Sequence, residues 1–335
     1  MNILLSSTGR KTYMIQYFKE ILNGSGKIFA SNNVMTYSLA QADGYLITTQ
    51  MYDDSYIAAL IDFCQANQIN CIMPLSDADL PILAKNRERL LNHHISVVVS
   101  NESVIETCND KWKTYQFLSS LGLPQPKTYI DPELAKQDIK SGNLTFPLIL
   151  KPRCGAEYMS VVEVDTIDEL NIFYQRVHHD ILKSYLRDIC QKEDIIIQEK
   201  IEGEQYSLDI LNDLEGNYIT TVAKQIITKD AGKTLVAKTV NNQPFENSVK
   251  LITSHLKPVA AIDADCFITD SGNAIILEIN GRTGNQYPFA HLAGVDFPKQ
   301  IIEWIKGAQT SKKYISFELG VTGKINSAPA KQIYF

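Results

Sequence analysis

The sequence predicts an α/β protein in which a doubly wound parallel-sheet domain precedes a region of mixed helices and antiparallel strands. Short apolar segments alternate with segments of helical periodicity over the first hundred residues, and this pattern is typical of a parallel sheet covered by helices. Gly122, with Pro124 and Pro126 behind it, ends a helix after that region. β-branched segments further on predict antiparallel strands.

The composition is that of an ordinary globular protein. Its 335 residues correspond to two or three packed units, and 44% of them are hydrophobic and 21% charged. A net charge of -6 gives no electrostatic reason to expect nucleic acid or an anionic membrane as a partner. The sequence has no apolar run that could span a bilayer and no basic leader, so we expect a cytoplasmic protein. Its 6 cysteines include no CxxC pair, which favours free thiols over a zinc site.

The elements of the first domain follow from the apolar pattern. Predicted strands cover residues 3–6, 27–31, 71–74 and 95–100, and predicted helices cover 13–22 and 56–65. Ligands of such sheets bind beyond the carboxyl ends of the strands. The segment Thr8-Gly9-Arg10 could bind a carboxylate or phosphate there, and Asp77 and Asp79 could bind an ammonium group. Helix capping is an equally good interpretation of both.

The rest of the chain predicts a second set of elements. Helices are expected over residues 111–121, 170–186 and 297–306. Strands are expected over 146–152, 160–164, 195–199, 206–211, 218–227 and 234–240, followed by a hairpin of 260–267 and 274–279. The segment after Lys306 could add edge strands or form an interface.

A metal site is predicted on this last hairpin. Period-two alternation places Glu278 and Asn280 on the same face of one strand, and Asp265 lies on its partner. Two carboxylates and an amide oxygen are ligands that suit Mg²⁺. Arg282 follows two residues later, and metal ions with a cation are what phosphoryl transfer requires. The alternative is that these polar residues simply face solvent.

Two further segments fit a nucleotide. Lys151 ends an apolar strand, where its ammonium could hold a phosphate oxygen; a surface lysine is the alternative. The run Gln198-Glu199-Lys200-Ile201, continued by Gly203-Glu204-Gln205, leads from one strand to the next. Such a linker can present backbone groups to a purine and a polar side chain to a ribose. The alternative is that the segment is an acidic hairpin turn.

The order of these segments resembles the ATP-grasp superfamily. Asp110-Lys111, Lys151-Pro152, Gln198-Glu199 and Glu278-x-Asn280-x-Arg282 occur in the order typical of single-module relatives of the carbamoyl phosphate synthase large subunit. The resemblance extends from Met1 to about Lys306. It implies an N-terminal domain of residues 1–108, two α+β subdomains of residues 109–200 and 201–310 that clasp ATP, and an extension of residues 311–335.

The resemblance also implies roles for individual residues. The phosphates of ATP are expected to contact Lys111 and Lys151, and the adenine to lie against the segment Gln198, Glu199, Lys200 and Ile201. The ribose is expected at Gln205 or Glu204. Two Mg²⁺ (or Mn²⁺) ions would be held by Asp265, Glu278 and Asn280. Arg282 would stabilise the transferring phosphoryl group, and Lys224 would face the acceptor.

The implied reaction is ATP-dependent ligation of a small-molecule carboxylate to an amine, or to a thiol, through an acyl phosphate, and a homodimer is the expected assembly. Residues 153–160, the expected lid, contain one glycine where the family's loop is usually glycine-rich, so a nucleotide-binding regulator without turnover stays open. A synthase of the carboxyphosphate or carbamoyl-phosphate type is a further alternative. A nicotinamide oxidoreductase is excluded because no G-x-G-x-x-G follows the first strand.

Overall fold

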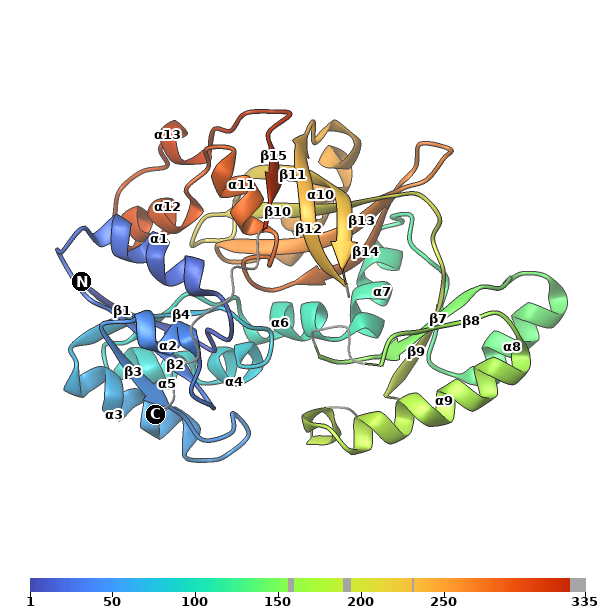
Figure 1. Cartoon of the computed structure of the whole chain (residues 1–335), viewed down its shortest axis with the longest axis horizontal. Helices are drawn as coiled ribbons and strands as arrows, with labels where there is room; N and C mark the ends of the chain where they lie inside the picture. Colours follow the sequence, from blue (N-terminus) through green and yellow to red (C-terminus); the bar gives the residue numbers. More distant parts are fainter. Residues whose placement is uncertain (156–159, 189–193, 231, 326–335) are drawn as a thin grey trace.

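The computed structural model describes residues 1–155, 160–188, 194–230 and 232–325. It contains three sheets, which Figure 1 shows as a parallel sheet at the left, an antiparallel sheet above the centre and a smaller sheet in a unit that protrudes at the right. The predicted combination of a parallel-sheet domain with a larger α+β region is confirmed.

The N-terminal sheet has the strand order β3-β2-β1-β4-β5 and is parallel throughout. Its strands are β1 (Asn2–Ser6), β2 (Ile28–Asn32), β3 (Gly44–Ile47), β4 (Ile69–Pro74) and β5 (Ser96–Val97). The strand order reverses between β1 and β4, which is where ligands of doubly wound sheets bind. The valine-rich segment expected as a strand over 95–100 contributes two residues to the sheet, and β3 was not predicted.

Helices cover both faces of this sheet because successive side chains of β1 alternate. Ile3 and Leu5 pack on one face with Phe18, whereas Leu4 packs on the other with Leu60. The covering helices are α1 (Thr12–Leu22), α2 (Tyr37–Gln41), α3 (Tyr56–Ala66), α4 (Leu80–Lys85) and α5 (Arg87–Asn92).

The central sheet has the order β14-β13-β10-β11-β12-β15. Its strands are β10 (Glu204–Asn212), β11 (Tyr218–Asp230), β12 (Lys233–Val240), β13 (Ala261–Ile268), β14 (Ala274–Asn280) and β15 (Thr322–Lys324). One face carries Leu208 and Ile262 and packs against α6 (Glu102–Asn109), α7 (Lys111–Ser120) and α10 (Glu246–Leu256). The alternate residues, among them Asp209 and Asp263, point to the opposite face, and this polar face carries the site. β15 uses the C-terminal segment that the sequence left open.

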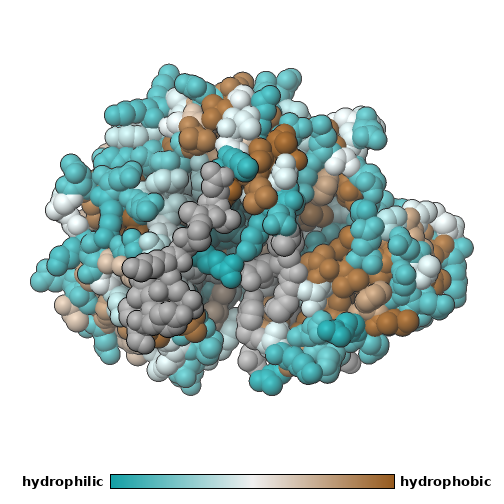
Figure 2. All heavy atoms as spheres, viewed as in Figure 1, coloured by the Kyte–Doolittle hydropathy of each residue, from teal (hydrophilic) through white to brown (hydrophobic). Residues whose placement is uncertain are grey.

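The third sheet has the order β6-β9-β7-β8 and belongs to the protruding unit. It comprises β6 (Thr128–Tyr129), β7 (Leu148–Pro152), β8 (Val162–Val164) and β9 (Ile195–Glu199), with α8 (Pro132–Ser141), α9 (Ile167–Leu182) and the short 3-10 helix η1 (Tyr185–Asp188). The predicted hairpin of β7 and β8 is confirmed. Figure 2 shows that hydrophilic residues cover most of this side of the molecule and that apolar residues gather over this unit, where Leu134 and Ile172 are exposed.

The C-terminal helices return to the N-terminal sheet. They are α11 (Tyr287–Leu292), α12 (Phe297–Ile305) and α13 (Lys312–Ile315), and the short 3-10 helix η2 (Gln243–Phe245) precedes α10. Tyr287 and Phe297 are fully buried in the same core as Phe18 of α1. Helices from the two ends of the chain, on either side of the predicted domain boundaries, therefore share one core. Within the described ranges, the helices are all too short or too polar to cross a membrane.

Candidate active site

A cavity of about 430 Å³ lies between the four-stranded sheet and the polar face of the central sheet. Its walls come from β7, β9, the linker to β10, β11, β13 and β14. Most residues predicted for the site line it: Lys111, Lys151, Gln198, Glu199, Lys200, Ile201, Gln205, Asp265, Glu278, Asn280 and Arg282. The fold therefore brings together side chains that are far apart in the sequence. Lys111 and Arg282, for example, are 171 positions apart.

The predicted metal ligands lie side by side on two paired strands. Asp265 pairs in register with Glu278, and Asp263 pairs with Asn280. Burial, with repulsion from Asp263 and Glu278, raises the pKa of Asp265 well above its usual value. A divalent cation would relieve this crowding of carboxylates, so the donor set fits Mg²⁺.

The side chain of Asn280 is oriented so that it could also bind the cation. Its Nδ2 donates to Asp263 Oδ2 at 3.2 Å, so the amide oxygen is the atom left for a cation. No group of three histidine, cysteine, aspartate or glutamate side chains that could hold a metal occurs in the described ranges. The ion would therefore bind to two carboxylates and an amide, and the phosphates of a nucleotide would complete its coordination.

Two lysines face these carboxylates. Lys151 is 7% exposed, and its Nζ lies 3.9 Å from Glu278 Oε2. Burial lowers the pKa of Lys151 to about 8. Attraction to Glu278 opposes this shift, and repulsion from Lys111 adds to it. Although burial acts in the opposite sense, Lys111 and Lys151 hold the pKa of Glu278 below its usual value. A cluster of cations beside a cation-binding carboxylate pair suits a metal-bound polyphosphate.

Asp110 positions the segments that carry both lysines. Its side chain caps α7 by accepting from Trp112 N at 2.9 Å, and it accepts from Arg153 Nε at 2.9 Å and Nη2 at 2.8 Å. The backbone N–H of Lys111 donates to Arg153 O at 3.0 Å. Asp110 thus joins the start of α7 to the residues that follow Lys151.

We expect Asp110→Ala to weaken ATP binding about tenfold, because the loss of a charge-assisted pair worth about 1.5 kcal/mol frees the segments of both lysines. Titration calorimetry with Mg²⁺ and a non-hydrolysable ATP analogue measures this. Asp131→Ala is the matched control, because Asp131 caps α8 by accepting from Glu133 N at 2.8 Å and does not line the cavity. Equal affinities in the two variants would contradict the role of Asp110.

An apolar part of the cavity suits a nucleoside. Ile149, Phe267 and Leu277 provide apolar surface beside the linker from β9 to β10. Of the two residues predicted for the ribose, Gln205 lines the cavity. Glu204 is exposed and accepts from the Tyr206 hydroxyl at 2.6 Å, so it is directed away from the cavity.

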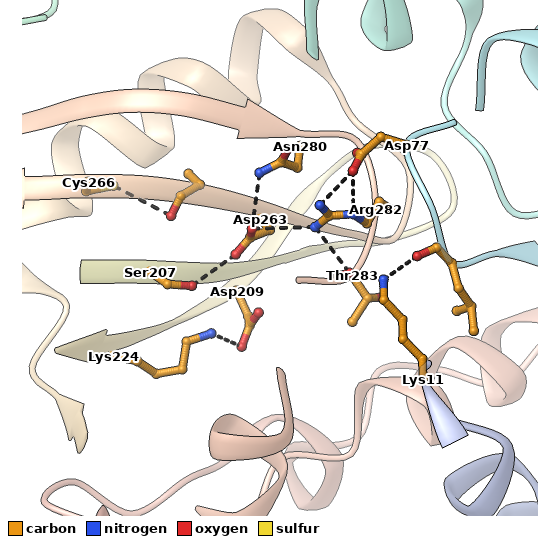
Figure 3. A network of polar contacts seen from close by, with 12 residues as sticks. Lys11, Asp77, Ser207, Asp209, Lys224, Asp263, Cys266, Asn280, Arg282 and Thr283 are labelled. Atoms are coloured by element: carbon orange, nitrogen blue, oxygen red, sulfur yellow. Dashed lines mark hydrogen bonds and ion pairs between the residues drawn. The ribbon is translucent and has the colours of Figure 1, made fainter. Parts of the chain in front are cut away.

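Lys224 is the residue predicted to face the acceptor. It is fully buried, does not line the cavity and forms an ion pair with Asp209 (Figure 3). Burial raises the pKa of Asp209 to about 6, although Lys224 opposes this. Asp209 Oδ1 has no hydrogen-bond partner in the described part of the chain. The ion pair lies buried on the polar face of the central sheet, and neither residue is among those that line the cavity.

Lys229, which the sequence reasoning missed, lies at the cavity instead. Burial lowers its pKa, whereas Asp265 and Glu278 act to raise it. Lys224 and Lys229 are five positions apart, so a regular strand would direct them to opposite faces. Two register shifts between Ile226 and Lys229 break this alternation, and no feature of the sequence marks them.

We expect Lys229→Met to lower the affinity for Mg²⁺-ATP about tenfold, the loss expected for one charged contact of roughly 1.5 kcal/mol to a phosphate. The KM for ATP in steady-state ADP release measures it. Lys233→Met removes an exposed lysine at the start of the neighbouring strand β12 and is the control. A KM unchanged in both variants would remove Lys229 from the nucleotide site.

Arg282 connects the cavity to the N-terminal sheet (Figure 3). Its Nε and Nη2 donate to Asp77 Oδ2 at 2.9 and 2.7 Å, and its Nη1 lies 3.5 Å from Asp263 Oδ2. From the sequence, Asp77 is expected to be an ammonium ligand or a helix cap, and its contact with Arg282 is not predicted. The two residues are 205 positions apart.

Other residues singled out in the sequence lie elsewhere. Thr8 is buried and shares a 3.0 Å hydrogen bond with Ser38. Asp79 makes no side-chain capping bond to α4 and accepts from the Tyr56 hydroxyl at 3.3 Å. Of the lid loop, residues 156–159 lie outside the described ranges.

The fold and the cavity define a nucleotide-dependent enzyme. Residues 108–285 match the family model described as "ATP-grasp domain", and residues 3–98 match the one described as "PylC-like, N-terminal domain". The chain belongs to the ATP-grasp family and is an ATP-dependent ligase of that family. The resemblance noted from the order of its motifs is therefore confirmed. Enzymes of this family use ATP and Mg²⁺.

Curated relatives are distant. A protein named carbamoyl-phosphate synthase from Methanobrevibacter smithii is 22% identical over 301 residues, which cover 85% of this chain and 76% of that protein. The arginine-specific large chain of carbamoyl phosphate synthase from Bacillus subtilis is 21% identical over 60% of this chain but only 19% of its own length. The chain thus spans about a fifth of this second relative.

Solved structures share the whole fold. An L-amino acid ligase from Bacillus licheniformis aligns with a TM-score of 0.75 at 16% identity, over 98% of this chain and 81% of that one. A biotin carboxylase in complex with βγ-ATP from Campylobacter jejuni has the same TM-score of 0.75 and 16% identity, over 96% and 74%. The biotin carboxylase domain of a Hydrogenobacter thermophilus 2-oxoglutarate carboxylase, a dimer with MgADP and bicarbonate, has a TM-score of 0.73 at 20% identity, over 94% and 72%.

Proposed function

We propose that this enzyme phosphorylates a small-molecule carboxylate with ATP and couples the resulting acyl phosphate to an amine, with release of ADP and phosphate. The observation that carries this proposal is one cavity in which the paired carboxylates of Asp265 and Glu278 face Lys151, with an apolar wall beside them. A phosphoryl group in transfer carries spread negative charge, and such a site can neutralise it without reorganising.

In this proposal each group has a defined task. Lys111, Lys151 and Lys229 bind the phosphates, and the side chains of Asp265, Glu278 and Asn280 hold two Mg²⁺ ions. Bound Mg²⁺ supplies positive charge that offsets the charge of the phosphates. Arg282 lines the cavity and keeps its Nη1 edge beside Asp263 and Asn280, next to the expected acyl phosphate.

A second candidate substrate is bicarbonate, which would give carboxyphosphate. The similarity to a protein named carbamoyl-phosphate synthase over 85% of this chain favours testing it. The similarity to an L-amino acid ligase supports an amino acid as the carboxylate. A regulator without turnover is disfavoured because carboxylates, amide and lysines are all in place around one cavity.

The proposal is tested by ADP release with Mg²⁺-ATP over a panel of amino acids, other carboxylates and bicarbonate, each with ammonia or a second amino acid. The carboxylate is then labelled with ¹⁸O. We expect acid-dependent ADP release and transfer of one ¹⁸O atom to phosphate, because the acyl phosphate breaks between carbon and the bridging oxygen. ADP release that needs no acid, or unlabelled phosphate, would overturn the acyl-phosphate mechanism. Light scattering of the purified protein tests the predicted homodimer.

A further inference from the structure

A buried carboxylate of the N-terminal domain, Asp77, is bonded to Arg282, which lines the cavity, and has one oxygen unused. Asp77 follows β4, beside the reversal of strand order between β1 and β4, and is 5% exposed. Its Oδ2 accepts both N–H groups from Arg282, whereas Oδ1 is buried and has no hydrogen-bond partner within the described ranges. A buried carboxylate oxygen without a hydrogen bond is unfavourable, so this atom is suited to a ligand that donates a hydrogen bond.

Lys11 contacts the loop that carries this carboxylate (Figure 3). Its Nζ donates to Leu75 O, two residues before Asp77. The charged groups that face it are Arg282 after β14, Asp77 and Asp79 after β4, and Asp263 on β13. Burial, with repulsion from Arg282, lowers the pKa of Lys11 to about 7. A large share of Lys11 is therefore uncharged near neutral pH, with a lone pair that can accept a proton while an N–H still donates to Leu75 O.

We propose that Asp77 and Lys11 form the amine subsite of the ligase, in which Asp77 Oδ1 binds the ammonium group of the nucleophile and Lys11 Nζ accepts its proton. This inference rests on the proposed function. Arg282 joins the two parts of the site, because it is bonded to Asp77 and also lines the cavity. The nucleophile is thereby held beside the acyl phosphate.

The charges at this position favour a primary amine over a thiol or an alcohol. Three carboxylates, those of Asp77, Asp79 and Asp263, surround Lys11 together with one further cation, Arg282. Burial raises the pKa of Asp79, so the excess is counted without this residue. When Lys11 is neutral, the carboxylates of Asp77 and Asp263 exceed the charge of Arg282 by one negative charge. A ligand that brings one positive charge and several N–H donors balances this excess.

The chemical step is balanced as follows. The ammonium group passes one proton to neutral Lys11 and becomes an amine with a lone pair. A carbon–nitrogen bond forms at the acyl carbon, and the bond from that carbon to the bridging oxygen breaks. Phosphate leaves with that electron pair and accepts the second proton from the nitrogen. Lys11 returns its proton to solvent. The step consumes no oxidant or reductant.

The test separates carboxylate activation from amine coupling. Hydroxylamine traps acyl phosphates as hydroxamates and is largely uncharged at neutral pH, so it needs neither an ammonium subsite nor a base. Hydroxamate and amide formation are measured for wild type, Lys11→Arg, Lys11→Met and Asp77→Asn. The controls are Lys27→Met and Asp54→Asn, which alter exposed residues of the same domain.

We expect hydroxamate formation by both Lys11 variants to stay within about threefold of wild type, and amide formation to fall about 100-fold, in the range of a lost general base. The wild-type kcat/KM for the amine should rise with pH through about 7, because neutral Lys11 is the active form. That inflection should disappear in Lys11→Arg, which keeps the charge but cannot accept the proton.

Three results would overturn the inference. Equal losses of hydroxamate and amide in the Lys11 variants would give Lys11 a role in activation or folding. Unchanged amide formation in Lys11→Met would remove it from the reaction. An unchanged KM for the amine in Asp77→Asn would remove the ammonium contact. A wild-type enzyme that forms no hydroxamate with any carboxylate would instead overturn the proposed function, and the amine subsite with it.

Discussion

ADP release should fall at least about 100-fold when Glu278 is replaced by glutamine. The substitution removes one negative charge from the expected Mg²⁺ ligands, and this charge also pairs with Lys151, whose Nζ lies 3.9 Å away. Losses of 10²–10³ are typical when one preorganised electrostatic group is removed from a site of charge transfer. The measurement is kcat for ADP release at saturating Mg²⁺-ATP and carboxylate.

Glu246→Gln provides the matched control for this experiment. Glu246 belongs to α10 of the same sheet unit, pairs with Lys250 on the surface and does not line the cavity. It should retain wild-type activity. A Glu278→Gln enzyme within threefold of wild type at every Mg²⁺ concentration would show that the carboxylate pair is not the metal site.

The second large effect concerns stability. Lys224→Met should lower the free energy of unfolding by about 3 kcal/mol or more, the loss typical when one partner of a buried ion pair is removed. Asp209, which is 1% exposed and whose Oδ1 already lacks a partner in the described part of the chain, would lose its cation. Urea unfolding followed by circular dichroism measures the change.

A double variant completes the test. Lys224→Met with Asp209→Leu removes both charges and should recover most of the lost stability, because no unpaired charge remains buried. If Lys224→Met is as stable as wild type but inactive, Lys224 has the acceptor-side role expected from the sequence and not a structural one.

The part of the expected metal site that lies on β14 was the most predictable from the sequence, because it depends on alternation alone. Glu278 and Asn280 are two positions apart on β14, and that spacing fixes a common face in any extended strand. Asp265 pairs with Glu278 through a register shift between Asp265 and Cys266, without which Asp265 would lie opposite Leu277, and no feature of the sequence marks this shift. The segment between β9 and β10 was predictable for a similar reason, since it ends one apolar strand and precedes another.

What could not be predicted depends on irregularity or on distance. The register shifts of β11 direct Lys229 to the cavity, and Asp209 places Lys224 in the interior, although both lysines are on the same strand. The contact between Asp77 and Arg282 joins two sheets whose mutual orientation no local pattern encodes. β3 was missed because it is a short edge strand in which exposed and half-buried residues alternate.

The bridge from Asp77 to Arg282 limits how the units of this protein can be exchanged or separated. Both side chains are buried, at 5% and 7% exposure, so a fragment that begins at residue 109 would leave a guanidinium without its main counter-charge. A chimera that takes its parallel sheet from another ligase would need an acidic residue at the same point after β4. Recombination between relatives would therefore succeed only when both halves of this ion pair are inherited together.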